Sequence, residues 1–217
     1  MSKLFPKSVN RLPIQIVVYL FVVSGLVVSG FAYYVTPKYT RVGYAPVQPV
    51  PFSHALHAGQ LGIDCRYCHS NVETSGFANL PTSQTCMNCH SQVKTNSPLL
   101  AGVRRSYETG QPIVWVQIHK VPEYVYFNHA IHIARGVSCV ECHGPVNHMD
   151  VVAENKSLSM GFCLNCHRDP ADHLRPLAEV TNLDWKAPSP EAQRRMGLKF
   201  VHDWNVNPPT SCSGCHR

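Results

Sequence analysis

Charged side chains are scarce in this sequence, and no cysteine stands outside a single motif. Only 15% of the 217 residues are charged, while 17 prolines and 13 glycines interrupt the chain. This composition argues against long amphipathic helices and predicts much turn and irregular structure, in one or two domains. No basic tail with interleaved aromatic residues is present either, so the formal charge of +6 does not indicate nucleic-acid binding.

All ten cysteines belong to one pattern, Cys-x-x-Cys-His. The five copies are Cys65-Cys68-His69, Cys86-Cys89-His90, Cys139-Cys142-His143, Cys163-Cys166-His167 and Cys212-Cys215-His216. Two thiols at this spacing can form thioether bonds with the two vinyl groups of one haem, and the adjoining histidine then reaches the iron as proximal ligand. The sequence therefore predicts five covalently attached haems c.

Other uses of paired cysteines are a redox-active disulfide and a zinc site. Five copies, each with histidine in the same place, argue against both. Few residues are available per haem, too few for a large aliphatic core, so we expect the porphyrins to form the core. The predicted fold is mainly α with much irregular structure. It combines one N-terminal transmembrane helix with a multihaem cytochrome c domain organised around five haems.

An apolar run from Ile14 to Val35 is long enough to cross a bilayer. Lys3, Lys7 and Arg11 precede it, and the positive-inside rule then places the N-terminus in the cytoplasm. The haem domain is therefore expected in the periplasm, on the outer side of the inner membrane, where c-type haems are attached. The alternative is a signal peptide cleaved near residues 30–32, although the apolar run is long for one.

A duplicated element precedes each of the first two pairs of haem motifs. Its two copies are Phe52-x-His54-x-x-His57 and Phe127-x-His129-x-x-His132. Histidines three residues apart share one side of a helical turn, so they can serve two closely placed haems. The repeat therefore predicts two modules of two haems each.

Eight histidines lie outside the attachment motifs: His54, His57, His119, His129, His132, His148, His173 and His202. Five distal positions need ligands, and we expect His54, His57, His119, His129 and His132 to fill them. Met149 and Met160 are rival ligands, and a thioether would raise the potential of its haem. Because ligands exceed positions, no iron needs to stay open, which favours an electron carrier over an enzyme.

These features divide the chain into six expected segments. They are a cytoplasmic N-terminus (1–13), a transmembrane anchor (14–36), a linker (37–51), a first haem module (52–110), a second haem module (111–169) and an extended arm with a fifth, C-terminal haem (170–217).

The Phe-x-His-x-x-His elements resemble the class III multihaem cytochromes of the c3/c7 type. A longer string runs from Trp115 through His119, Pro122 and the second repeat to Met160-Gly161-Phe162-Cys163. With the anchor, it resembles the pentahaem cytochrome subunit of alternative complex III. That resemblance implies membrane partners, namely multi-helix quinol-oxidising subunits and an iron–sulfur protein that supplies electrons. It implies a monohaem cytochrome c or a terminal oxidase as acceptor.

A rival class is the quinol dehydrogenases of the NapC/NrfH type, which also have one N-terminal helix but oxidise quinol themselves. They usually carry four haems, and some place methionine two residues after a motif histidine. Here the first four motifs are followed at that position by Asn71, Gln92, Pro145 and Asp169. A small haem reductase with a five-coordinate iron is a third possibility.

Overall fold

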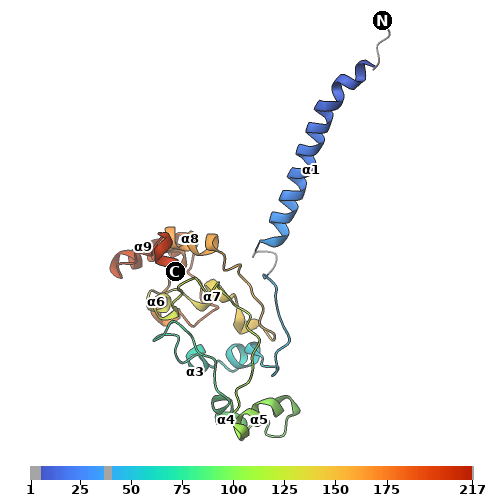
Figure 1. Cartoon of the computed structure of the whole chain (residues 1–217). Coiled ribbons are helices and arrows are strands. Elements are labelled where there is room, and N and C mark those ends of the chain that lie inside the picture. The colour runs from blue at the N-terminus through green and yellow to red at the C-terminus, as the bar shows by residue number, and fades with distance from the viewer. Residues whose placement is uncertain (1–5, 37–40, 217) are drawn as a thin grey trace. The chain divides into compact units, whose positions relative to one another are not determined.

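The computed structural model describes residues 6–36 and 41–216 and divides the chain into two units, Met1–Arg41 and Val42–Arg217 (Figure 1). The first unit holds the 3-10 turn η1 (Lys7–Arg11) and the helix α1 (Leu12–Val35). Pro13 stands in the first turn of α1, where its missing N–H costs no hydrogen bond. Of the three basic residues expected to set the orientation, Lys3 lies outside the described residues.

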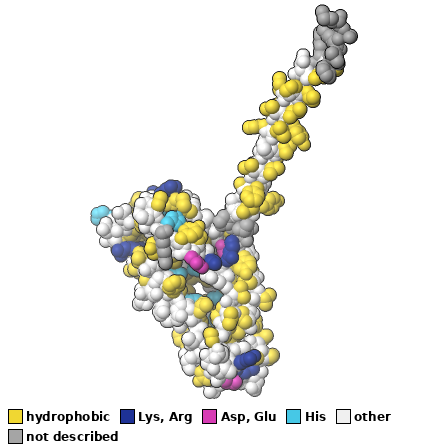
Figure 2. Space-filling model, viewed as in Figure 1, with side chains coloured by type: hydrophobic (Ala, Val, Ile, Leu, Met, Phe, Trp, Pro, Cys, Tyr) yellow, Lys and Arg dark blue, Asp and Glu magenta, His cyan; other side chains and the backbone are white. Residues whose placement is uncertain are grey.

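Helix α1 is apolar around its whole circumference, and none of its residues is buried. Figure 2 shows hydrophobic side chains along its length. Its 24 residues span about 36 Å, which exceeds the roughly 30 Å thickness of the bilayer interior. Among the described residues, one helical stretch is long and apolar enough to cross a membrane, Ser8–Val35, and it contains α1. These properties fit a single-pass anchor.

The second unit consists of short helices joined by irregular segments. In order these are η2 (Ala55–Gln60), α3 (Cys65–Cys68), α4 (Ser83–His90), η3 (Pro98–Leu100), α5 (Ala101–Thr109), α6 (His129–Ala134), α7 (Cys139–His143), η4 (Val146–His148), α8 (Met160–Arg168), η5 (Pro170–His173), η6 (Leu177–Glu179), α9 (Pro190–Asp203) and α10 (Cys212–Cys215). Over the described ranges no strand forms, and two isolated bridges are the only β pairing. The expectation of a mainly helical, irregular fold is confirmed.

Every attachment motif forms a helical turn, and polar caps set where several turns begin. Asp64 accepts a hydrogen bond from Arg66 N before α3, and Ser159 accepts one from Phe162 N before α8. Asn128 caps α6 in the same way. Capping satisfies backbone N–H groups that the first turn leaves without partners. The helical turn then puts cysteines three residues apart on one face, as a shared porphyrin requires.

The linker is fixed to the second module by backbone pairing. Gly43 N donates to Glu154 O, and Glu154 N donates to Tyr44 O. Farther along, the side-chain amide of Gln48 makes two hydrogen bonds of 2.9 Å with the backbone of Val116. Residues 43–48 therefore belong to the folded domain.

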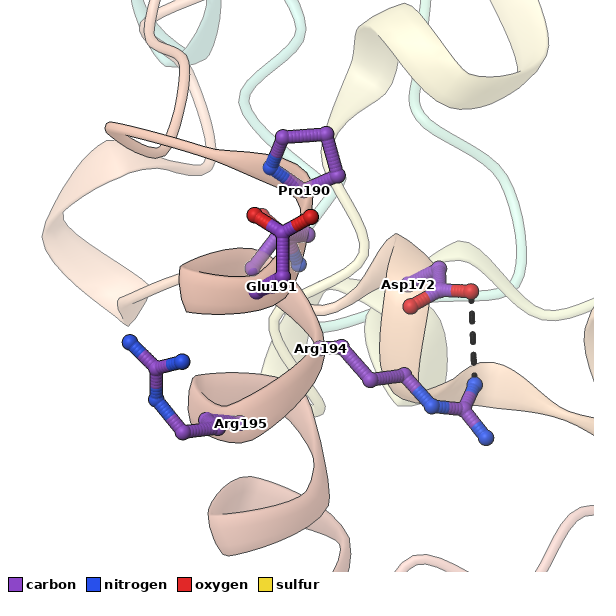
Figure 3. Close-up of a pocket in the computed structure, with 6 residues that line it drawn as sticks. Asp172, Pro190, Glu191, Arg194 and Arg195 are labelled. Atoms are coloured by element: carbon purple, nitrogen blue, oxygen red, sulfur yellow. Dashed lines mark hydrogen bonds and ion pairs between the residues drawn. The ribbon is translucent and has the colours of Figure 1, made fainter.

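The arm (residues 170–217) differs from the expected extended segment. Its longest element is the 14-residue helix α9, which packs against η5. Gly197 faces Ala171 so closely that a Cβ would collide with the Ala171 carbonyl. Arg194 of α9 pairs with Asp169 and Asp172, and Figure 3 shows its contact with Asp172.

The same arm supplies most of the small aliphatic core. The buried aliphatic side chains among the described residues are Val50, Val72, Val103, Ala171, Leu174, Val180 and Leu183. Four of the seven lie between residues 171 and 183, and Leu174 is 1% exposed. The stretch 170–211, which carries no haem motif, thus holds most of the buried aliphatic side chains of the described residues.

Candidate haem-binding sites

The five attachment motifs define five sites, called first to fifth in chain order. In both repeats one phenylalanine orients both histidines. The Phe52 ring lies 4.8 Å from the His54 ring at 87° and 4.4 Å from the His57 ring at 24°. The Phe127 ring lies 4.7 Å from each of the His129 and His132 rings, at 87° and 29°. The sequence repeat is therefore also a structural repeat.

Three expected distal histidines lie opposite three motif histidines. The ring centroids are 6.1 Å apart for His57 and His90 and 6.1 Å for His132 and His167. For His129 and His143 the separation is 6.3 Å, with nearly parallel rings. Metal–nitrogen bonds of about 2 Å would place two imidazoles on opposite sides of one ion with centroids about 6 Å apart. The spacing fits one iron between each pair.

Six of these candidate ligands share one hydrogen-bonding pattern, in which Nδ1 lies 2.7–3.0 Å from a backbone carbonyl. The pairs are His57 with Ser53, His69 with Asn79, His90 with Val93, His129 with Gly76, His132 with Asn128 and His167 with Pro209. Since a carbonyl can only accept, the Nδ1 atoms must donate. Their Nε2 atoms are then left as lone-pair donors, which is the usual arrangement for a histidine that binds a metal.

Burial keeps several of the candidate ligand imidazoles neutral. It lowers the pKa of His143 to about 3 and the pKa of His54 to about 4, and it also lowers the pKa of His132. Nearby histidines add to the shift at His143 and His54. Neutral imidazole is the form that binds iron, so the surroundings already favour the binding-competent state.

Burial has the opposite effect on the thiols. It raises the pKa of Cys142 to about 12 and the pKa of Cys166 to about 11. Reactive and metal-binding cysteines instead have a lowered thiol pKa. The surroundings in the second module therefore favour the neutral thiol form of these two cysteines over the thiolate.

The fifth site is built differently. Among the described residues, the ring next to His216 is that of Tyr124, at 5.6 Å and 40°. His119, expected to be a distal ligand, lies instead against His143, at 4.3 Å and 84°. That distance is too short for an iron between the two rings. The distal ligand of the fifth site remains a prediction, as does the role of His54 as a distal ligand.

The remaining histidines have other surroundings. His148 Nε2 lies 2.7 Å from Asp184 Oδ1, and His173 Nδ1 lies 2.9 Å from Glu141 Oε2. The His202 side chain on α9 is 90% exposed. Of the rival methionines, Met149 is half-buried beside η2, and Met160 is exposed at the start of α8.

Sequence reasoning missed the groups that orient the histidines. Gly76, Asn79 and Pro209 act through backbone carbonyls, which carry no sequence signature. Asn79 has a positive φ of 70°, a conformation that asparagine tolerates better than most residues. The one sequence feature that could have pointed to Asn79 is that it is a polar residue in a loop.

Comparison with known proteins gives two matches. The family described as cytochrome c7 and related cytochrome c matches residues 50–108 and 125–217, well over half of the chain. A curated relative, the menaquinone reductase multihaem cytochrome c subunit of Nitratidesulfovibrio vulgaris, is 33% identical over 126 residues. That alignment covers 58% of this chain and 53% of the relative. The chain thus spans about half the length of the relative it matches.

Proposed function

Because the chain belongs to the family of cytochrome c7 and related cytochromes c, we propose that it is the five-haem electron-transfer subunit of a quinone-linked membrane complex. The observation that carries this proposal is the set of opposed histidine pairs at 6.1–6.3 Å. Two strong ligands on each iron suit electron transfer, whereas substrate chemistry needs an open position.

The chain's residues would hold the cofactors as follows. Each motif's two cysteines would hold the porphyrin, and its histidine would bind the iron. The second iron ligand would be His54 in the first site, His57 in the second, His129 in the third and His132 in the fourth. Haem c would supply reversible one-electron chemistry at each position. The protein's part is to fix the imidazoles through their Nδ1–carbonyl bonds, which limits rearrangement when the charge changes.

For the fifth site two ligands remain in competition, His119 and Met160. Met160 stands one turn before Cys163 on α8, and the thiols of Cys163 and Cys215 lie close enough to interact. Near-infrared magnetic circular dichroism of the oxidised protein separates bis-histidine from histidine–methionine ligation. Replacing Met160 with alanine removes the histidine–methionine signal if Met160 is the ligand and changes nothing if His119 is.

The membrane placement follows from α1. We propose that α1 anchors the chain in the inner membrane with its N-terminus in the cytoplasm and the haem domain in the periplasm. The apolar surface of α1 supports its role as the anchor. The basic residues that precede it in the sequence support the orientation. Protease added to intact spheroplasts should digest the haem domain and spare a tag on the N-terminus.

The partners are the finer part of the proposal. An alternative complex III would supply electrons from quinol through an iron–sulfur protein and pass them to a monohaem cytochrome c or a terminal oxidase. The relative is named a menaquinone reductase subunit, which raises the opposite direction of electron flow, with electrons delivered to a quinone. A quinol dehydrogenase of the NapC/NrfH type would need no such partners.

One purification separates these possibilities. The tagged native chain is isolated in mild detergent, its subunits are identified, and its intact mass is measured. We expect five haem additions and several large membrane subunits. Stopped-flow reduction by menaquinol would then be tested with the complex and with the isolated chain. Rapid reduction of the isolated chain would favour the quinol dehydrogenase, and a mass lacking five haems would refute the carrier proposal.

A further inference from the structure

Each haem module donates a backbone hydrogen bond to the other, and the two bonds lie at equivalent positions of the repeat. Ala130 N, in the second repeat, donates to Ser75 O in the first module at 3.2 Å. Ala55 N, in the first repeat, donates to Met149 O in the second module at 3.0 Å. Ser75 lies six residues after His69, the first motif histidine of its module, and Met149 lies six residues after His143, the first motif histidine of the other module. Such mutual contacts are typical of a two-fold relation, in which the same surface is used twice.

Further contacts lie beside each of these two backbone hydrogen bonds, and together we call them the exchange between the modules. His129 N and Nδ1 both donate to Gly76 O, at 3.3 and 2.8 Å. On the other side, Ser53 Oγ donates to Asp150 Oδ1 at 2.6 Å. Gly76 and Asp150 are again equivalent, one residue beyond Ser75 and Met149. In addition, η2 of the first module packs against η4 of the second.

The exchange brings the first and third sites together. His69 Nδ1 donates to Asn79 O, in the same loop that accepts from His129 through Gly76. One loop, residues 70–79, therefore orients the proximal histidine of the first site and the distal histidine of the third. The Cys65 and Cys139 side chains of these sites also lie close enough to shift each other's pKa.

The other sites lie outside this centre. His129 and His132 stand in one repeat and face His143 of the third site and His167 of the fourth, so these two sites are neighbours. The equivalent repeat places His57 opposite His90 of the second site and also holds His54, the proposed ligand of the first. Beyond the fourth site, His167 Nδ1 donates to Pro209 O at 2.7 Å, next to the fifth motif.

We infer that the two modules are related by an internal pseudo-two-fold axis between the first and third sites, so that the sites follow one another in space as second, first, third, fourth and fifth. This order rests on the proposed function, since it concerns the haems that the motifs would hold. The loop 70–79 is the joint at the centre. The row ends at the second site, formed by α4 beside α5, and at the fifth, formed by α10. Figure 1 shows α4 and α5 far from α8 within the haem domain.

The order assigns the two ends to the two partners. An electron donor would be oxidised at one end, and an acceptor would be reduced at the other by the same number of electrons. By chain order alone the first site would be an end. In the inferred order it is internal, with neighbours on both sides.

The test perturbs one site and records the potentials of the others in the complete haem-loaded protein. Histidine-to-methionine substitution at a distal ligand raises the potential of its own site, so that site stays reduced while the others titrate. An added electron nearby lowers the midpoint of a neighbouring haem, and the effect weakens with distance. Potentiometry followed by electron paramagnetic resonance resolves the individual low-spin signals.

The matched variants are His129→Met at the third site and His57→Met at the second. We expect His129→Met to lower the midpoints of the first and fourth sites and to leave the second unchanged. His57→Met should lower the midpoint of the first site only. A shift of the second site in His129→Met, or of the third site but not the first in His57→Met, would overturn the order.

Failure of the order and failure of the proposed function give different results. Intact mass and the count of low-spin signals in the unsubstituted protein report whether five haems are present. If five are present and the neighbours shift in another pattern, the order fails alone. If fewer are present, the carrier proposal fails first.

Discussion

His54 and His129 occupy the same place in the repeat but have different surroundings. His129 Nδ1 donates to Gly76 O at 2.8 Å, whereas His54 Nδ1 is buried with no hydrogen-bond partner among the described residues. The residue equivalent to Gly76 is Asp150, and its carboxylate accepts from Ser53 instead. Duplication of a sequence motif thus copies the histidines and their phenylalanine, but it does not copy the groups that hydrogen-bond to them.

The modules also differ in what covers them. The arm lies mainly on the second module, where Ser138 Oγ donates to Val180 O and Arg175 N donates to Gly136 O. Arg175, 7% exposed, also contacts Glu141 between the two cysteines of the third site. On the first module, Thr181 of the arm donates through its hydroxyl to Asp64 and accepts from the Cys65 thiol through its carbonyl, and both bonded residues of the first module lie at the start of α3. The second module should therefore be the more rigid half.

The largest difference is expected on removing a haem. Replacing Cys139 and Cys142 with serine deletes the central third site, where His143 is deeply buried, and should abolish accumulation of folded protein, because bound cofactor contributes folding free energy directly. Replacing Cys86 and Cys89 deletes a site at the periphery and should leave a four-haem protein. Haem staining and intact mass after periplasmic extraction measure both. Equal losses would show that the two modules depend on their haems alike.

Removing core packing from the arm should have the next largest effect. Leu174→Ala is expected to cost about 2–5 kcal/mol of unfolding free energy, as truncation of a buried leucine does. The control is Leu99→Ala at a position 63% exposed, which should change stability by less than about 0.5 kcal/mol. Chemical denaturation followed by tryptophan fluorescence compares the two. Similar midpoints would mean that the arm does not support the haem domain.

The two repeat histidines should set different potentials. A histidine whose Nδ1–H donates to a carbonyl is a stronger electron donor to its metal, so the third site should have a lower midpoint than the first. Redox potentiometry of the two low-spin signals measures the difference. Replacing His54 with methionine identifies the first site's signal. A first site at or below the third would contradict the assignment of His54 as its ligand.

The smallest expected effect is the pH dependence of the contact between the arm and the second module. The hydrogen bond to Glu141 raises the pKa of His173, and Asp172 and Asp169 add to the shift. Stabilisation by protonated His173 is then fully present below the ordinary histidine pKa of about 6.5. It is lost as pH rises through the raised value in the folded state.

Denaturation midpoints measured between pH 5 and 9 test this contribution. His173→Gln should remove the part of the decline that histidine titration causes. His202→Gln serves as the control, since its side chain is 90% exposed. An unchanged pH profile in His173→Gln would show that the contact carries no linked proton.

Several expectations could be made from sequence because the interactions are local. A helical turn places cysteines three residues apart on one face, and it does the same for His129 and His132. The opposed pairs that include His57, His129 and His132 therefore follow the repeat. His119 stands outside both repeats, in the segment that begins at Trp115, and the fold places it against His143.

The arm shows why the rest could not be predicted. Its prolines suggested an extended chain, yet Ser189 caps α9 and Pro190 begins it, where proline is compatible with a helix. Its buried Leu174 and Val180 do not follow a helical or strand period. Their burial arises from packing against residues 136–141, far away in sequence.

The sequence by itself determined which residues are expected to bind haem, because thioether attachment and the placement of paired histidines depend on residues within one or two turns. The tertiary structure alone decided which sites are neighbours. Contacts such as Ala130 with Ser75 and His129 with Gly76 join segments more than 50 residues apart, and their acceptors are backbone carbonyls, which every residue carries.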